Sequence, residues 1–352
     1  MPTTYAIPNG RTVMDATTYT GTNAALTVSN ADNGTTGFQP DFVWFKLRSS
    51  VSRNTLFDSV RGNTKVVWSD STDAEGTATG GTGLTSFNTN GFTLGTEIAG
   101  TSGSTNFNGS TYVAWQWKAN GTAVSNTSGT ITSSVSANTT AGFSIVTFTG
   151  TGANLTFGHG LSTAPAFVIM KTRNQGGAGY KWVVYHSSIG NTGALFLNGT
   201  DATSTSSGYW NNTSPTSSVV SIGTAINTSG TDTFVAYCWT PIAGFSQFGS
   251  YTGNGSADGP FVYLGFRPKF VLLKRSSAVG NWIIYDASRN TYNVANNMLF
   301  PNTADAEDTG GAIDILSNGF KARSTSASWN GSGDTYIYAA FAENPTKFAN
   351  AR

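Results

Sequence analysis

The sequence predicts an all-β protein made of three tandem β-sandwich modules of the jelly-roll or lectin type. Three observations favour this fold class: landmarks that recur three times in one order, apolar runs of strand length, and the absence of an amphipathic stretch of helical period. Charged residues make up 11% of the 352 residues, against about 25% in an average soluble domain. With 9 Trp, 13 Tyr and 22 Phe, the chain has enough large apolar side chains to bury a core and fold.

The clearest repeat is the heptapeptide Pro-x-Phe-Val-x-x-Lys, at residues 40–46, 165–171 and 268–274. We call its closing residues the repeat lysines: Lys46, Lys171 and Lys274. Further along each copy comes a strand-like segment, which begins at Thr111, Thr233 and Thr335. The spacing from the repeat proline to this threonine is nearly constant. The chain therefore reads as three modules of about 100 residues, the size of one β-sandwich.

The apolar runs inside the landmarks have the length and composition of strands. Residues 42–45, 167–170 and 270–273 are continuous runs of aromatic, β-branched and other apolar residues, typical of strands buried on both faces. Turns such as Asn108-Gly109 and Asn254-Gly255 separate the strands, and these residue types tolerate positive φ. Because the connections are short, we expect antiparallel pairing.

Composition shifts set the expected boundaries. Residues 1–120 form an N-terminal arm and module 1, residues 142–241 form module 2, and residues 242–352 form module 3. Residues 121–141 are dominated by Ser, Thr, Ala, Asn and Gly, which predicts a flexible linker that lets modules 2 and 3 swing as one unit. The arm, Met1 to Arg11, precedes every landmark, and either the arm or module 1 is expected to dock to a larger assembly.

Several classes of partner and cofactor are unexpected for this chain. A net charge of +1 without a basic run argues against nucleic-acid binding. One cysteine and two histidines are too few for the common transition-metal sites, so no metal or cofactor is expected. The chain has no apolar stretch of about 18 residues and no signal-peptide pattern, so we expect synthesis in a cytoplasm and no membrane insertion.

Two pairs of carboxylates are the candidates for catalysis. Asp73/Glu75 and Asp305/Glu307 have the same i, i+2 spacing, and enzymes that cleave sugars need two converging carboxyl groups. Glycine and threonine neighbours favour a loop instead. We interpret both pairs as solvated turn residues, with calcium binding and catalysis as the alternatives.

Aromatic and amide residues late in modules 2 and 3 are the candidates for carbohydrate binding. They are Tyr209, Trp210 and Asn211, and Trp329 and Asn330. A pyranose ring can stack on Trp210 or Trp329 while the amides hydrogen-bond its hydroxyls. The interpretation that we favour is that these rings cap the sandwich core or fill a subunit interface.

The remaining chemistry-bearing residues are expected to serve the fold. A catalytic role for His186 would need a nucleophilic serine, and the sequence has no Gly-x-Ser-x-Gly motif, so we interpret His186 as a loop or edge residue. We interpret His159 as a turn residue. Cys238 reads as a small buried apolar residue on a strand. The repeat lysines are expected to snorkel or to shield a sheet edge.

The landmarks resemble a module common in virion proteins of aquatic tailed phages. The resemblance rests on residues 251–255, 265–268 and 338–345, and it covers modules 2 and 3 better than module 1. Module 1 lacks the Gly-Phe-Ser strand opening found at residues 142–144 and 244–246. The resemblance implies concanavalin-like sandwiches with a structural or adhesive role on tail fibres or other appendages, usually in homotrimers. It supplies no catalytic residues.

The sequence-based expectation is therefore a non-enzymatic virion protein, most readily a tail-fibre or receptor-binding component that contacts a host surface glycan or protein. A head decoration or spike protein is the alternative within this class, and a polysaccharide depolymerase is the alternative from another class. Expected partners are other copies of the chain in a homotrimer and other virion proteins.

Overall fold

Strands make up almost all the regular structure of this protein. The computed structural model describes residues 5–31, 36–98 and 105–345. Within these ranges the helices are the 3-10 turn η1 (Gly10–Thr12) and the single turn α1 (Ser207–Trp210). The all-β expectation is confirmed. Neither of these helices has the length and apolar character needed to cross a membrane.

The strands belong to three consecutive parts of the chain, which we call the N-terminal segment (residues 14–117), the middle segment (124–239) and the C-terminal segment (246–345). The N-terminal segment contains β1 (Met14–Thr20), β2 (Leu26–Ser29), β3 (Phe42–Leu47), β4 (Asn54–Asp58), β5 (Lys65–Trp68), β6 (Gly76–Thr77), β7 (Leu84–Asn88), β8 (Gly91–Leu94) and β9 (Thr111–Trp117). The middle segment contains β10 (Val124–Asn126), β11 (Ser133–Asn138), β12 (Phe143–Thr149), β13 (Leu155–Gly158), β14 (Phe167–Thr172), β15 (Val183–His186), β16 (Gly193–Phe196), β17 (Ser204–Thr205), β18 (Val219–Ile222) and β19 (Thr233–Trp239). The C-terminal segment contains β20 (Ser246–Thr252), β21 (Phe261–Tyr263), β22 (Phe266–Arg275), β23 (Trp282–Asp286), β24 (Ile313–Leu316), β25 (Gly319–Ala322) and β26 (Thr335–Pro345).

Each segment combines a large antiparallel sheet with a small one. The large sheets have the orders β1-β9-β3-β4-β5-β6, β10-β11-β12-β19-β14-β15-β16-β17 and β20-β26-β22-β23. The small sheets are β2-β8-β7, β13-β18 and β21-β25-β24. One four-strand order therefore recurs, β1-β9-β3-β4, β12-β19-β14-β15 and β20-β26-β22-β23, in which the last strand of each segment lies beside the strand of the repeat heptapeptide.

The heptapeptide strands lie inside the large sheets because their residues are apolar on both faces. Every residue of β3 and β14 is buried, as the continuous apolar runs predict. Phe42, Phe167 and Phe270 each lie opposite an aromatic residue of the segment's last strand. The turns at Gly109 and Gly255 have positive φ, as expected from their Asn-Gly pairs.

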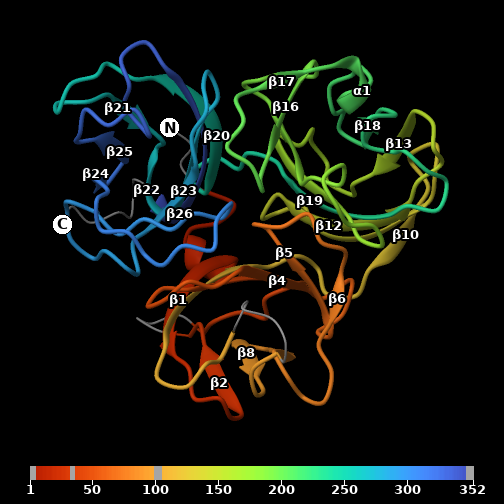
Figure 1. The fold of residues 1–352 in the computed structure, drawn as a ribbon, viewed down its shortest axis with the longest axis horizontal. Helices are drawn as coiled ribbons and strands as arrows, with labels where there is room; N and C mark the ends of the chain where they lie inside the picture. The colour runs from red at the N-terminus through yellow and green to blue at the C-terminus, as the bar shows by residue number, and fades with distance from the viewer. Residues whose placement is uncertain (1–4, 32–35, 99–104, 346–352) are drawn as a thin grey trace.

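A single apolar core joins the three segments. Figure 1 shows the segments as three lobes around a common centre, and one cluster of buried side chains contains residues of all three. Phe42 stacks on Tyr237 of the middle segment with ring centroids 4.3 Å apart. Trp117 lies 5.6 Å from Phe341 of the C-terminal segment, and Trp239 lies 6.3 Å from the same ring. Aromatic burial on this scale stabilises the arrangement of the segments as well as each segment.

The repeat lysines lie at the three junctions between segments. Each is the next-to-last residue of β3, β14 or β22, and each side chain is almost completely buried. Their Nζ atoms donate to backbone carbonyls across the junctions, 3.2 Å from Lys46 to Thr303, 3.2 Å from Lys171 to Thr72, and 3.2 Å from Lys274 to Thr200. Together these three contacts join each segment to the next, so that the segments form a closed ring. The lysines serve the fold, but the prediction that they snorkel or shield an edge is wrong, because their strands lie inside the sheets.

The interpretation of residues 121–141 as a flexible linker is wrong. Within this range β10 and β11 extend the large sheet of the middle segment, and Val135 pairs with Val146 of β12. Val135 is buried in the core of this segment. Ser134, Ser136 and Asn138 make one face of β11 polar, so the composition of this strand resembles that of a linker. The middle segment therefore cannot swing on this part of the chain.

The N-terminal arm is part of the core where the structure describes it. Residues 1–4 lie outside the described residues. Ile7 is buried in the shared core, and η1 packs on β26 of the C-terminal segment. Arg11 is buried and pairs with Asp15 at 3.1 Å, while Lys269 reaches the other oxygen of Asp15 at 3.2 Å. The described part of the arm is therefore packed against the rest of the chain, and docking of the arm or of module 1 to a larger assembly stays a prediction.

Candidate functional site

The aromatic candidates of the middle segment lie in and around α1. Ser206 caps this helix by accepting a hydrogen bond from Gly208 N–H, and Asn211 ends it in the left-handed conformation that asparagine tolerates. The ring of Trp210 is buried, and its Nε1 donates to the carbonyl of Gly193 at 2.9 Å. Tyr209 is half-buried and faces a hollow described below. Trp210 is therefore a core residue, and stacking of a sugar on it is excluded.

The candidates of the C-terminal segment are also interior residues. Trp329 is buried in the shared core, and Asn330 is completely buried. The Asn330 amide donates to the carbonyls of Ser256 and Ser324 at 2.7 and 2.8 Å, which fixes the loop that follows β20. These two residues cap the sandwich core, the interpretation favoured from the sequence, and they are not available to a carbohydrate.

The glutamates of the two carboxylate pairs form ion pairs between segments. Glu75 accepts from Arg173 of the middle segment at 2.8 and 2.9 Å and from Arg61 at 3.0 Å. Burial raises the pKa of Glu75, but the two guanidinium groups outweigh it and hold the pKa below its ordinary value. The prediction of a solvated turn is wrong for this glutamate.

Glu307 repeats this arrangement at the junction of the C-terminal and N-terminal segments. It accepts from Arg48 at 2.8 and 2.9 Å and from Arg289 at 2.8 Å. Burial acts against ionisation, yet the pKa of Glu307 is also lowered by the two arginines. For Glu307, as for Glu75, the solvated-turn prediction is wrong.

The aspartates of the pairs are exposed, as predicted. Asp73 pairs with Arg53 at 2.5 Å with half of its side chain in solvent, and Asp305 accepts from the hydroxyl of Thr303 at 2.7 Å. Within the described residues no group of three His, Cys, Asp or Glu side chains is placed to hold a metal ion.

The two histidines and the cysteine are buried. His159 follows β13, accepts from Leu161 N–H through Nδ1, and has a pKa lowered by burial. His186 ends β15 inside the large sheet, so its assignment to a loop or an edge is wrong. It contacts the carbonyl of Tyr338 at 3.1 Å, and burial lowers its pKa to about 4. Cys238 is completely buried, as predicted, with a pKa raised to about 12 by burial.

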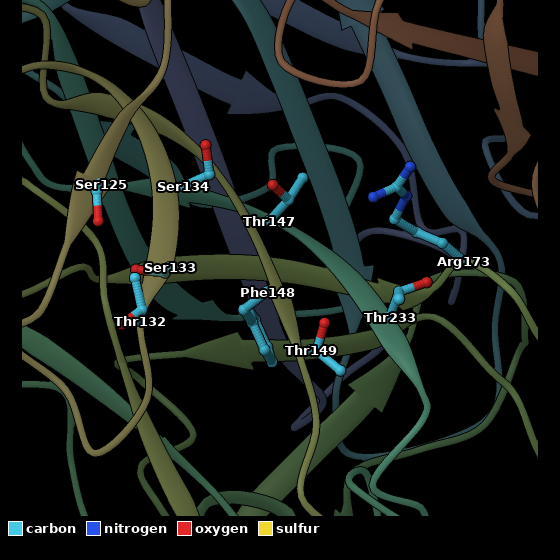
Figure 2. Close-up of a pocket in the computed structure, with 9 residues that line it drawn as sticks. All are labelled: Ser125, Thr132, Ser133, Ser134, Thr147, Phe148, Thr149, Arg173 and Thr233. Atoms are coloured by element: carbon cyan, nitrogen blue, oxygen red, sulfur yellow. The ribbon is translucent and has the colours of Figure 1, made fainter.

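One hollow of the middle segment, of about 360 Å³, is lined mainly by hydroxyl groups. Its lining residues are Ser125, Thr132, Ser133, Ser134, Thr147, Phe148, Thr149, Arg173 and Thr233 (Figure 2). Arg173 is the single charged residue among them, and its guanidinium is already paired with Glu75. A hydroxyl needs an adjacent base to become a nucleophile, and this hollow supplies none.

A second hollow of the middle segment, of about 620 Å³, combines aromatic rings with charged groups. Phe196 of β16 and Tyr209 of α1 meet edge to face, with centroids 6.0 Å apart and an angle of 75°. The ammonium group of Lys181 lies 4.3 Å from the Phe196 ring centroid and 3.3 Å from an oxygen of Asp201. The tyrosine hydroxyl is 2.9 Å from the hydroxyl of Ser204.

This hollow brings together residues that sequence reasoning did not combine. Tyr209 was a candidate, whereas Lys181 and Phe196 were not. The repeats within the sequence could have pointed to them. Arg53 and Trp68 hold the positions in the N-terminal segment that correspond to Lys181 and Phe196, and the guanidinium carbon lies 4.9 Å from the indole centroid. The second hollow can bind a small amphipathic molecule, and neither hollow contains a nucleophile with its base.

Comparison with known proteins gives one match. A family model described as "Domain of unknown function (DUF7483)" matches residues 10–345, a range that includes all three segments. No curated protein and no solved structure matches the chain.

Proposed function

Because the chain belongs to the DUF7483 family, whose description assigns no function, we propose a role from the chain's own geometry: a non-enzymatic structural protein of a tailed-phage virion, built from three tandem sandwich modules. In this proposal the three modules correspond to the three segments, and the pairing of a large with a small sheet in each segment supports it. A tail-fibre or receptor-binding component that contacts the host surface is the form of this role that we put first.

The observation that carries the proposal is the closed ring of contacts between the segments. Besides the three lysine contacts, backbone N–H groups donate across each junction, from Glu75 to Arg173 at 2.6 Å, from Thr203 to Ser276 at 2.9 Å, and from Glu307 to Arg48 at 2.9 Å. A protein joined in this way around one core is a rigid block. A rigid protein with few charged groups suits a virion component that must withstand mechanical force and present a surface to the host.

The depolymerase alternative has less support. A glycosidase needs a carboxyl group with a raised pKa as its acid and a second carboxylate facing it across the bond. The pKa values of Glu75 and Glu307 are lowered, and arginines occupy their oxygens. The test is host polysaccharide incubated with purified protein. No release of sugar is expected, and release that is lost when Asp73, Glu75, Asp305 and Glu307 are all replaced by alanine would establish the enzyme instead.

The place on the particle is tested by immunogold labelling of purified virions. We expect label on the tail. Label on the capsid and none on the tail would establish the head decoration or spike alternative, and an unlabelled particle would contradict the virion role altogether.

The homotrimer stays a prediction about assembly. Weakly charged surfaces can pair with copies of themselves, and within this chain the three segments already bury apolar residues against one another. A trimer would therefore use the outer faces. Light scattering tests it: a particle of three 36.8 kDa chains is predicted, and a mass near one chain would contradict the trimer.

A further inference from the structure

We infer that the hollow lined by Phe196 and Tyr209 binds a neutral saccharide of one or two rings. This inference rests on the proposed function, because it gives the contact with the host surface a ligand class. The hollow is about 620 Å³, within the usual range of roughly 300–1,000 Å³ for small-molecule sites.

The shape of the apolar part favours a puckered ring over a flat one. Phe196 and Tyr209 meet edge to face at 75°, and the Lys181 ammonium group lies over the Phe196 ring, so the half-buried rings do not offer a pair of parallel faces. A planar base or indole needs parallel faces to be sandwiched, whereas a pyranose can lay one C–H face on Tyr209 and turn its hydroxyl groups toward Lys181, which lies over Phe196.

The polar side chains that line this hollow are suited to hydrogen-bond the hydroxyl groups of a sugar. The Lys181 ammonium is a donor only and the Asp201 carboxylate is an acceptor only, and a sugar hydroxyl can accept from one and donate to the other. The two groups lie 3.3 Å apart and about 38% and 52% of their side chains are exposed, so both can be reached from solvent. Their charges cancel, which favours a neutral ligand over an acidic or basic one.

The N-terminal segment contains the same trio without a binding surface. Arg53, Trp68 and Asp73 repeat the cation, the ring and the acid, but Trp68 is 7% exposed and Gly76 of β6 packs against its indole. In the middle segment the equivalent ring is half-buried, and Tyr209 adds a second face. The matched position in the N-terminal segment therefore serves as an internal control.

The experiment is saturation-transfer NMR on the full chain with glucose, galactose, mannose, N-acetylglucosamine and a disaccharide of each. We expect transfer to at least one of these sugars. Tyr209→Ala and Asp201→Asn should each weaken its binding at least tenfold, while Tyr209→Phe, which keeps the ring, should stay within about threefold. Arg53→Ala should leave binding unchanged, and circular dichroism should show all four variants folded.

Two results would overturn the inference. In the first, none of these sugars shows saturation transfer, whether adenosine or sialic acid binds instead or no ligand binds at all. The other is a folded Tyr209→Ala protein that binds as tightly as the original chain. If either result is obtained and immunogold labelling still finds the protein on the virion, the proposed function stands. If the protein binds a sugar but immunogold labelling does not find it on the virion, only the virion role is contradicted.

Discussion

The residues that most constrain this molecule are the repeat lysines. Each ammonium group is buried and donates to two backbone carbonyls, one of them in another segment. Burial, the dominant influence, lowers the pKa of each of these lysines to about 8 from an ordinary value of 10.5. Carbonyl dipoles replace the water that a charged ammonium group loses, but they do not replace it fully.

The contribution of these lysines to stability should therefore rise with pH on the alkaline side. Between pH 8 and 10.5 the unfolded chain binds more protons at these lysines than the folded chain, so the free energy of unfolding increases with pH. Each lysine should add on the order of 1 kcal/mol between pH 8 and about 9.5. Urea unfolding at the two pH values measures this.

Lys171→Met supplies the control for this prediction. It removes one of the three titrating lysines and keeps most of the apolar side chain, so the change in unfolding free energy between the two pH values should be smaller by on the order of 1 kcal/mol. A gain that is equal in the variant and in the original chain would show that the lysines do not cause it.

At the scale of elements, three loops form the junctions: those that follow β5 and β16, and the one that follows Leu299, which forms an isolated bridge with Ile284. The loop at residues 70–75 reaches the middle segment, the loop at 198–203 reaches the C-terminal segment, and the loop at 300–307 reaches the N-terminal segment. Glu75 and Glu307 are therefore structural residues. Their role follows from which segment lies beside each loop.

Glu75→Gln should destabilise the protein by about 2 kcal/mol, because Arg61 and Arg173 lose a charged acceptor at a partly buried junction. Asp73→Asn is the matched control, two residues away in the same loop. Its ion pair is half exposed, so the change should be below about 1 kcal/mol. Equal losses in the two variants, measured by urea unfolding, would contradict the junction role.

The elements themselves could be predicted from the sequence where both faces of a strand are apolar. Residues 42–45, 167–170 and 270–273 are such strands, and their repetition also revealed that they are equivalent. Residues 133–138 could not be recognised in this way, because β11 is polar on one face and composition alone favours a linker.

The candidate site was predicted only in part, because local sequence does not show what packs on a ring. Trp210 and Tyr209 are neighbours, yet one is buried against Gly193 and the other faces a hollow. Lys181 and Phe196 reach that hollow from other parts of the segment. Their proximity depends on the register of β15 and β16, which pairs Val183 with Phe196.

At the scale of the whole molecule, the three segments have cores of different kinds. The N-terminal and middle segments each have a core between their own two sheets, while the core of the C-terminal segment is continuous with the shared one. The shared core and the ring of junctions couple the segments, because no segment can leave without exposing aromatic rings and unpairing buried lysines. The central claim is therefore that the chain folds and unfolds as one unit.

Equilibrium unfolding in urea, followed at once by tryptophan fluorescence and by far-ultraviolet circular dichroism, tests this claim most directly. Tryptophans lie in all three segments, so fluorescence reports on each. Because the shared core and the junction contacts couple the three segments, we predict a single unfolding transition with the same midpoint by both methods. Two or three separate transitions, or midpoints that differ between the methods, would show that the segments are independent modules and would contradict the account.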